Sequence, residues 1–198
     1  MNFIRSMVVV LCVLSGSVAT AQDFDKGVAA YQAGDFATAL EEWRPLAEQG
    51  VAAAQFKLGW MYGIGEGVPQ DYSETARWYR LAAERGDVSA QYELGWMYRI
   101  GTGVLLDNSE AVKWFRLAAE QGLADAQSNL GVMYDSGHSV LQDNVIAHMW
   151  YNIGAANGNA LGVMNRRNIA ARMSPADISL AQAMARECMS SGYVDCGW

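Results

Sequence analysis

Few side chains in this sequence combine in the way that catalysis requires. His138 and His148 are the only histidines among the 198 residues, and no other ligands accompany them at a recognisable zinc-site spacing. We therefore expect both histidines on the surface or in helix packing. No Gly-x-Ser-x-Gly elbow occurs, and no lysine lies three residues after a serine, so serine acyl transfer has no support.

The stretch Gly63 to Gly67 has the glycines of a phosphate-binding loop but not its other features. It lacks a following Lys-Ser or Lys-Thr and has a counterpart 36 residues later, so a turn between helices is the better interpretation. Glu66 and Asp71 could form a carboxylate pair, but the counterpart of Glu66 is Thr102, and Asp71 suits a helix N-cap. The sequence thus predicts no catalytic residue, no metal site and no cofactor.

The first 21 residues have the organisation of a secretory signal peptide. Arg5 precedes an apolar run from Met7 to Leu14, and Ala19-Thr20-Ala21 has the small residues of a cleavage site. The run is too short to span a bilayer, and no second candidate follows it. We therefore expect cleavage after Ala21 and a periplasmic or secreted product without a membrane span.

Two cysteines remain after that cleavage. Cys188 and Cys196 are eight positions apart, and an oxidising compartment favours a disulfide between them. A redox or metal pair is the alternative, but the chain lacks both a Cys-x-x-Cys spacing and a nearby histidine. The disulfide would hold the tail that contains Tyr193 against the last helix.

The charge balance argues against a nucleic-acid partner. The chain has 14 basic and 21 acidic residues, a net charge of -7, whereas phosphate binding needs clustered cations. Its 52% of hydrophobic residues suffices for a packed core. An acidic surface suits a basic partner, although net charge alone does not identify one.

The chain repeats itself every 36 residues. In this register Gly50, Gly86, Gly122 and Gly158 align, and other identical residues align with them. These are Ala54/Ala90/Ala126, Gln55/Gln91/Gln127, Leu58/Leu94/Leu130, Gly59/Gly95/Gly131, Tyr62/Tyr98/Tyr134, Asp71/Asp107/Asp143 and Trp78/Trp114/Trp150. The period predicts stacked helical units that bury their apolar faces against one another.

The first half of each block predicts a helix with a glycine inside it. Apolar residues of the stretch 54–62 recur at steps of three and four, which places them on one helix face. Glycine inside a helix costs about 1 kcal/mol relative to alanine. Gly59, Gly95 and Gly131 therefore predict a close approach by a neighbouring helix.

The second half of each block predicts another helix. Asp71 is expected to cap its start, with Glu74 as the capping-box partner, and Asp107 with Glu110 repeats this pair. The helix ends before Gly86, in the position of a C-terminal glycine cap.

Three motifs carry a family resemblance: Ala-Gln-Phe-Lys-Leu-Gly-Trp-Met-Tyr at 54–62, Gly-Glu-Gly-Val-Pro-Gln-Asp-Tyr at 65–72, and Ala-Arg-Trp-Tyr-Arg-Leu-Ala-Ala-Glu at 76–84. With them the chain resembles the Sel-1-like repeat family, a relative of the tetratricopeptide repeat. The third block departs from the pattern, with Ser139 for the second loop glycine and Ile146 for the capping glutamate. The resemblance implies an all-α fold, a right-handed α-α superhelix of about ten helices in antiparallel pairs.

We expect four parts along the chain. They are the signal peptide (1–21), a degenerate N-terminal helical pair (22–49), three 36-residue repeats (50–157), and C-terminal capping helices with the Cys188-Cys196 tail (158–198). Asp35 and Ser174 are expected N-caps in the flanking parts. Arg166, Arg167 and Arg172 predict a basic outer face on the terminal repeat.

Side chains that vary between repeats on the inner wall are the candidate binding residues, because the first helix of each pair usually builds that wall. The candidates are Lys57, Trp60, Glu93, Trp96, Arg99, Asn129 and Asp135. For Trp60 and Trp96, the spacing leaves open whether they are core side chains or exposed anchors of an interface.

Our hypothesis is a non-enzymatic exported scaffold that binds a protein or peptide partner of the cell envelope in a concave groove. The resemblance implies adaptor roles, including cell-envelope and polysaccharide-export assembly. One rival is a penicillin-binding or weak β-lactamase-type enzyme, as in cysteine-rich relatives, but each of their repeats has a cysteine pair and none does here. A purely structural spacer is the other rival, and the oligomeric state stays open.

Overall fold

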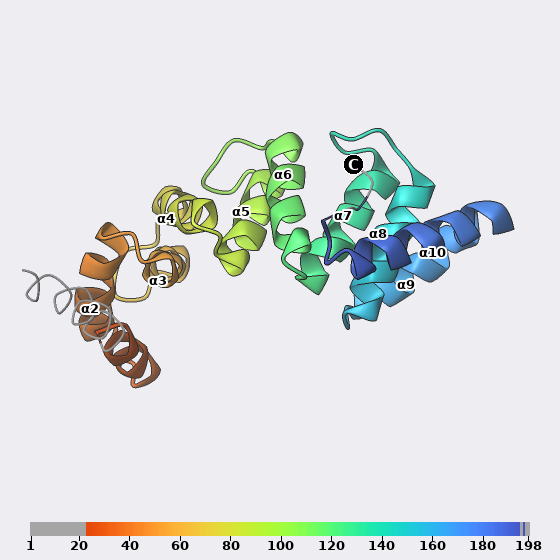
Figure 1. Cartoon of the computed structure of the whole chain (residues 1–198). Coiled ribbons are helices and arrows are strands. Elements are labelled where there is room, and N and C mark those ends of the chain that lie inside the picture. The colour runs from red at the N-terminus through yellow and green to blue at the C-terminus, as the bar shows by residue number, and fades with distance from the viewer. Residues whose placement is uncertain (1–22, 195, 197–198) are drawn as a thin grey trace, which may run out of the picture. The chain divides into compact units, whose positions relative to one another are not determined.

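The computed structural model describes residues 23–194 and Cys196, and every regular element in that part of the chain is a helix. The expected signal peptide, residues 1–21, lies outside the described residues. The chain divides into two compact units between Arg85 and Gly86. Each unit is described by itself (Figure 1).

The first unit packs its helices around an aromatic core. Its helices are the segment 23–32, α2 (Phe36–Glu48), α3 (Ala52–Ile64) and α4 (Tyr72–Glu84). Helix α3 packs against both α2 and α4. Buried Trp43, Leu58, Met61 and Trp78 join the three helices, with half-buried Tyr62 packed against them.

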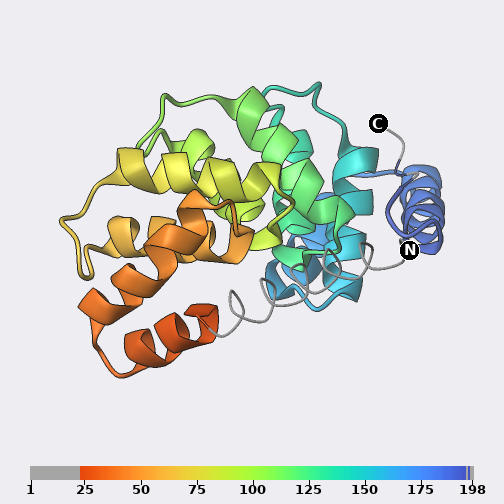
Figure 2. The ribbon, with the colours of Figure 1, turned by 60° about the vertical axis from the view of Figure 1, so that its left-hand side comes forward.

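The second unit contains the remaining helices. They are α5 (Val88–Ile100), α6 (Asn108–Glu120), α7 (Ala124–Ser136), α8 (Asn144–Ala156), α9 (Ala160–Ala170) and α10 (Pro175–Ser190). Consecutive helices from α5 to α9 pack against one another, and α10 packs against α8. Figure 2 shows the helices of the pairs α5–α6 and α7–α8 side by side, joined by long loops.

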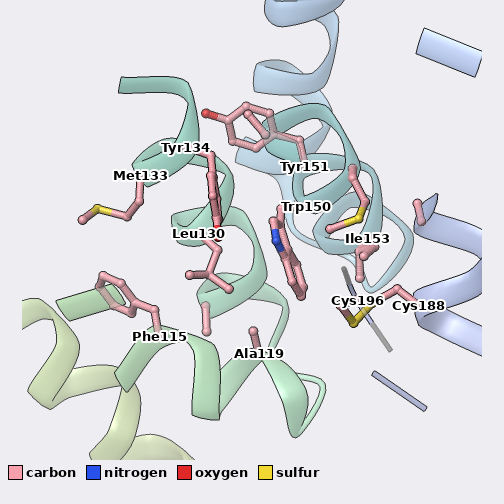
Figure 3. Close-up of a cluster of buried hydrophobic side chains, with 14 of the residues drawn as sticks. Phe115, Ala119, Leu130, Met133, Tyr134, Trp150, Tyr151, Ile153, Cys188 and Cys196 are labelled. Atoms are coloured by element: carbon pink, nitrogen blue, oxygen red, sulfur yellow. A yellow bond between two sulfur atoms is a disulfide. The ribbon is translucent and has the colours of Figure 1, made fainter. Parts of the chain in front are cut away.

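The core of the second unit lies between α6, α7 and α8. Phe115, Leu130 and Trp150 are fully buried there (Figure 3). The disulfide between Cys188 and Cys196 belongs to the same buried cluster.

The tail beyond α10 folds back as expected. The backbone N–H of Tyr193 donates to the carbonyl of Cys188 at 2.8 Å, and the Tyr193 hydroxyl accepts a hydrogen bond from Asn157 Nδ2 at 2.8 Å. These bonds hold the tail against both the last helix and the end of α8.

An aspartate caps the second helix of each repeat. The Oδ1 of Asp71 accepts hydrogen bonds from the backbone N–H groups of Ser73 and Glu74 at 2.8 and 3.1 Å. Asp107 and Asp143 make the same pair of bonds at the starts of α6 and α8. Two of the unpaired N–H groups at each helix start are thereby satisfied, and the predicted N-caps are confirmed. Asp35 and Ser174 cap α2 and α10 as predicted.

The predicted capping boxes are wrong in their second half. The backbone N–H of Asp71 donates to the carbonyl of Tyr62 at 2.9 Å and so is not available to Glu74. The Glu74 carboxylate instead pairs with Arg77 at 2.7 Å. Glu110 likewise pairs with the lysine three residues after it, so both glutamates support the helix surface.

Gly86 and Ser139 are among the residues with a left-handed backbone conformation. Gly86 has φ +87° just after α4, which confirms the predicted glycine cap. In the third long loop Ser139 keeps φ +57°, close to the +69° of its counterpart Gly103, at a cost of about 1 kcal/mol. Each of the two loops exposes 90% of a leucine, Leu105 or Leu141.

The glycines inside the first helices make room for aromatic rings. A Cβ on Gly95 would lie 2.7 Å from Cδ1 of Phe115 on α6, a distance that real Cβ atoms essentially never show. The same relation joins Gly59 to Tyr79 and Gly131 to Tyr151. The predicted close approach is confirmed, and the approaching group is a ring from the second helix of the same repeat.

We expect Gly95→Ala to lower the free energy of unfolding by about 1–3 kcal/mol, although alanine is the better helix former. The reason is that Phe115 is fully buried and also packs against Tyr92 and Trp96. Urea denaturation of the full chain measures the change. Gly63→Ala is the control, because its Cβ would meet only Thr75, at 3.3 Å. Equal stability of both variants would contradict the explanation.

Buried glutamines join α3 and α7 to the helix that precedes each of them. Gln127 on α7 donates from Nε2 to the carbonyl of Ala119, in the last turn of α6, at 3.1 Å. Its Oε1 accepts a hydrogen bond from Asn157 Nδ2 at 2.8 Å. In the first unit, Gln55 likewise donates to the carbonyl of Ala47 at 3.0 Å. Gln55 and Gln127 therefore satisfy carbonyls at helix ends, which the sequence pattern did not reveal.

Gln127→Ala should destabilise the chain by about 1–3 kcal/mol, because the carbonyl of Ala119 and the amide of Asn157 both lose a buried partner. The midpoint of urea denaturation tests this expectation. Gln182→Ala, at an exposed position of α10, should have no comparable effect. An unchanged midpoint for Gln127→Ala would contradict the stabilising role of these hydrogen bonds.

Candidate binding surface

In the first unit the candidates Lys57 and Trp60 lie on α3, outside the buried core. Trp60 is 40% exposed, and its Nε1 donates a hydrogen bond to the hydroxyl of Tyr31 at 3.1 Å. Burial and a hydrogen bond with Glu66 raise the pKa of the Tyr31 hydroxyl, which therefore stays protonated at neutral pH. Trp60 is therefore not a core side chain, and its role as an interface anchor stays a prediction.

Trp96 has a mixed position in the second unit. Its ring packs edge-on against Phe115 with centroids 6.0 Å apart, so part of the side chain belongs to the core. The guanidinium carbon of Arg99 lies 4.7 Å from the centroid of the Trp96 ring, within the range of a cation-π contact. Trp96 is therefore a half-buried side chain that already receives one cation from its own helix.

Arg99 and Asn129 connect α5 with α7. Arg99 Nη1 donates to Asn129 Oδ1 at 3.3 Å. The Asn129 amide nitrogen donates to the carbonyl of Asp125 at 2.9 Å and lies 3.5 Å from the hydroxyl of Tyr92. These contacts orient the side chains of neighbouring repeats toward one another. Arg99 and Asn129 were predicted for the site from sequence, whereas Tyr92 was not.

Tyr92 and Asp125 are residues that the sequence analysis missed. Tyr92 packs on Phe115 with ring centroids 5.9 Å apart. Burial raises the pKa of its hydroxyl, and the nearby carboxylates of Asp125 and Glu93 raise this pKa further. The available signal was variation between repeats, because the counterparts of Tyr92 are Phe56 and Ser128.

Glu93 is a half-buried carboxylate without a compensating cation. Burial raises the pKa of Glu93, and no ion pair of the described residues includes it. We refer to Tyr92, Glu93, Trp96, Arg99, Asp125 and Asn129 together as the α5–α7 surface. It brings aromatic, amide, guanidinium and carboxylate groups together on two adjacent first helices.

Asp135 belongs to a different set of contacts. It forms an ion pair with Arg172 and accepts a hydrogen bond from the Tyr151 hydroxyl at 3.3 Å. Burial and the Asp135 carboxylate raise the pKa of Tyr151. Arg172, which was expected on a basic outer face, is exposed and forms this ion pair with α7. Arg166 also turns to a neighbour, donating to Asn152 at 2.7 Å.

The two histidines occupy the places expected of them. His138 is exposed in the loop after α7, beside Ser136. His148 is buried in α8, and burial together with the positive charge of Arg166 lowers its pKa. Within residues 23–194 and Cys196, no three His, Cys, Asp or Glu side chains are grouped to hold a metal ion. No helix in that part of the chain has the length and apolar character needed to cross a membrane.

Comparison with known proteins identifies the class of this helical repeat. The family model described as "Sel1 repeat" matches residues 52–87, 88–123 and 124–159. The chain belongs to the Sel1 repeat family. The fold class expected from sequence, an all-α superhelix built from helix pairs, is confirmed. No curated protein matches the chain.

Two solved structures are similar to the chain. One is a protective antigen of uropathogenic Escherichia coli strains that displays an SLR fold, with 38% identity, a TM-score of 0.71 and coverage of 80% of this chain but only 35% of the antigen. The other is a Sel1 repeat protein from Oxalobacter formigenes, with 39% identity, a TM-score of 0.61 and coverage of 65% of this chain and 97% of that protein. The chain thus spans about a third of the length of the antigen.

Membership of the Sel1 repeat family indicates what kind of surface such a chain presents. The Sel1 repeat fold is a non-catalytic scaffold type, and Sel1 repeats generally mediate protein-protein interactions. The α5–α7 surface has the aromatic and arginine side chains that are common in such interfaces.

Glu93→Gln should stabilise the free protein at neutral pH. A folded-state pKa above the unfolded value means that the ionised carboxylate opposes folding. As the pH falls through the folded pKa toward the unfolded one, Glu93 takes up a proton and this penalty disappears. The gain in melting temperature over wild type should therefore be largest near neutrality and shrink in acid.

Thermal denaturation across this pH range provides the measurement. Glu84→Gln, an exposed glutamate at the end of α4, should leave the melting temperature unchanged. A lower melting temperature for Glu93→Gln would mean that the carboxylate has a structural partner.

Proposed function

We propose that the chain is a non-enzymatic, exported scaffold that binds a protein or peptide partner through the inner faces of its first helices. The observation that carries the proposal is the α5–α7 surface. There, half-buried Trp96 and Arg99 lie in contact, and Arg99 donates a hydrogen bond to Asn129 of the next repeat. In the first unit, exposed Trp60 offers a second aromatic contact.

An interface of this composition has a clear physical basis. Aromatic and arginine side chains account for much of the binding free energy of protein interfaces when a partner excludes water from them. Hydrogen bonds within the surface fix Arg99 and Asn129 before a partner arrives, so less conformational entropy is lost on binding. A role in cell-envelope assembly or regulation is part of the proposal.

Export is supported by two features. The sequence of residues 1–21 has the charged, apolar and small-residue regions of a signal peptide. The structure joins Cys188 to Cys196, and disulfides persist in oxidising compartments. A periplasmic or secreted location agrees with both.

Partner capture tests the proposal. Pull-down from an envelope extract compares the intact protein with the variant that combines Trp60→Ala, Trp96→Ala and Arg99→Ala. We expect the variant to recover at least about tenfold less partner, because truncation of interface anchors commonly costs 1–2 kcal/mol each. Circular dichroism verifies that the variant remains helical.

The matched control combines Tyr72→Ala, Leu105→Ala and Arg167→Ala, which also removes exposed aromatic, apolar and basic side chains. It should retain the partner in full. Equal recovery by all three proteins would contradict the assignment of the inner face and favour a structural spacer. Hydrolysis of nitrocefin by purified protein above a heat-killed control would favour the enzymatic rival.

A further inference from the structure

We infer that the α5–α7 surface binds a basic segment of the partner, and that Glu93 receives a lysine or arginine side chain of that segment. This inference rests on the proposed function and specifies the chemistry of the partner. It concerns the second unit alone.

In and around this surface, the arginines already have partners within the protein, whereas the carboxylates of the surface have no ion-pair partner among the described residues. Arg99 contacts the Trp96 ring and Asn129, and Arg172 pairs with Asp135. Both basic groups are thus engaged within the protein. Glu93 and Asp125 form no ion pair with any described residue.

The second carboxylate lies in the same neighbourhood. The Asn129 amide nitrogen lies 2.9 Å from the carbonyl of Asp125 and 3.5 Å from the Tyr92 hydroxyl, so Asp125 lies next to the helix that carries Glu93. The carboxylates of Asp125 and Glu93 both raise the pKa of Tyr92. Asp125 accepts a hydrogen bond from Asn159 Nδ2 at 2.5 Å, but an amide does not neutralise its charge. An incoming cation would therefore meet negative charge from two adjacent repeats.

The aromatic groups suit the rest of a basic side chain. Lysine and arginine carry apolar stems that pack on aromatic surfaces while the charged end reaches an acceptor. Trp96 and Tyr92 are both half-buried, and Trp96 follows Glu93 by three residues, which places the side chains of Glu93 and Trp96 on the same face of α5. The contact between Arg99 and Trp96 shows that this ring already accepts a guanidinium.

Glu93 forms no ion pair with the described residues that would stabilise the fold. Burial raises the pKa of Glu93, so we expect its ionised carboxylate to lower the stability of the free protein. The equivalent positions hold Lys57 and Asn129, so the carboxylate is not required by the repeat frame. A partner cation would remove the penalty upon binding, which makes ligand recognition the role that fits the residue.

Peptide titrations of the full chain test the inference. The probes are Ac-AKAKAKA-NH2, its glutamate counterpart Ac-AEAEAEA-NH2 and its glutamine counterpart Ac-AQAQAQA-NH2, followed by chemical-shift changes in the 15N-labelled protein at low ionic strength. We expect the lysine peptide to shift the signals of Glu93, Trp96 and Asn129. Neither of the other peptides should do so.

Glu93→Gln should weaken binding of the lysine peptide about five- to tenfold while the protein stays folded. Glu120→Gln is the matched control, because burial also raises the pKa of this α6 glutamate, but it lies outside the α5–α7 surface. Its affinity should equal that of wild type. Wild-type affinity for Glu93→Gln, equal binding of the acidic peptide, or no binding of the lysine peptide would overturn the inference.

The envelope pull-down separates this inference from the proposed function. If the Trp60, Trp96 and Arg99 variant loses the partner while Glu93→Gln retains all of it, the cationic contact is wrong and the binding scaffold stands. If neither variant loses any partner, both are wrong. Loss of the partner in both variants supports both.

Discussion

The structure depends on the contact between a glycine backbone and an aromatic ring within each repeat. Gly59, Gly95 and Gly131 lack the Cβ that would meet the ring of the second helix. The ring can therefore lie directly against the first helix, and the close packing typical of protein interiors follows. Because the ring sets how the two helices of a repeat meet, it also sets which side of the first helix remains for other contacts.

Hydrogen bonds of buried side chains connect neighbouring helices. Gln127 reaches a helix-end carbonyl of the preceding repeat and accepts a bond from the helix end of its own repeat. Gln127, a member of the recurring glutamine column, thus satisfies polar groups at two helix ends. Glu93 and Asn129 occupy a position that differs in every repeat, so recognition can vary without a change of fold.

The sequence predicted the frame well and the surface only in part. Steric and capping requirements recur with the period, so the inner glycines, the aspartate caps and Gly86 were found at their positions. The partner of Glu74 was wrong, because the backbone of Asp71 had already bonded to Tyr62. The direction of Arg172 and the neighbourhood of Tyr92 depend on contacts between different helices, which no repeat pattern encodes.

The third long loop differs from the second at several positions, and one of these differences affects the backbone, since Ser139 stands where the second loop has Gly103. Ser139 holds a left-handed backbone that Gly103 adopts without strain, and each loop displays an exposed leucine. Backbone strain in the folded loop lowers the free energy needed to open it transiently, and proteases cleave segments that open in this way. Chymotrypsin should therefore cleave the chain after Leu141 sooner than after Leu105. The sizes of the first two fragments would identify the loop that opens more readily.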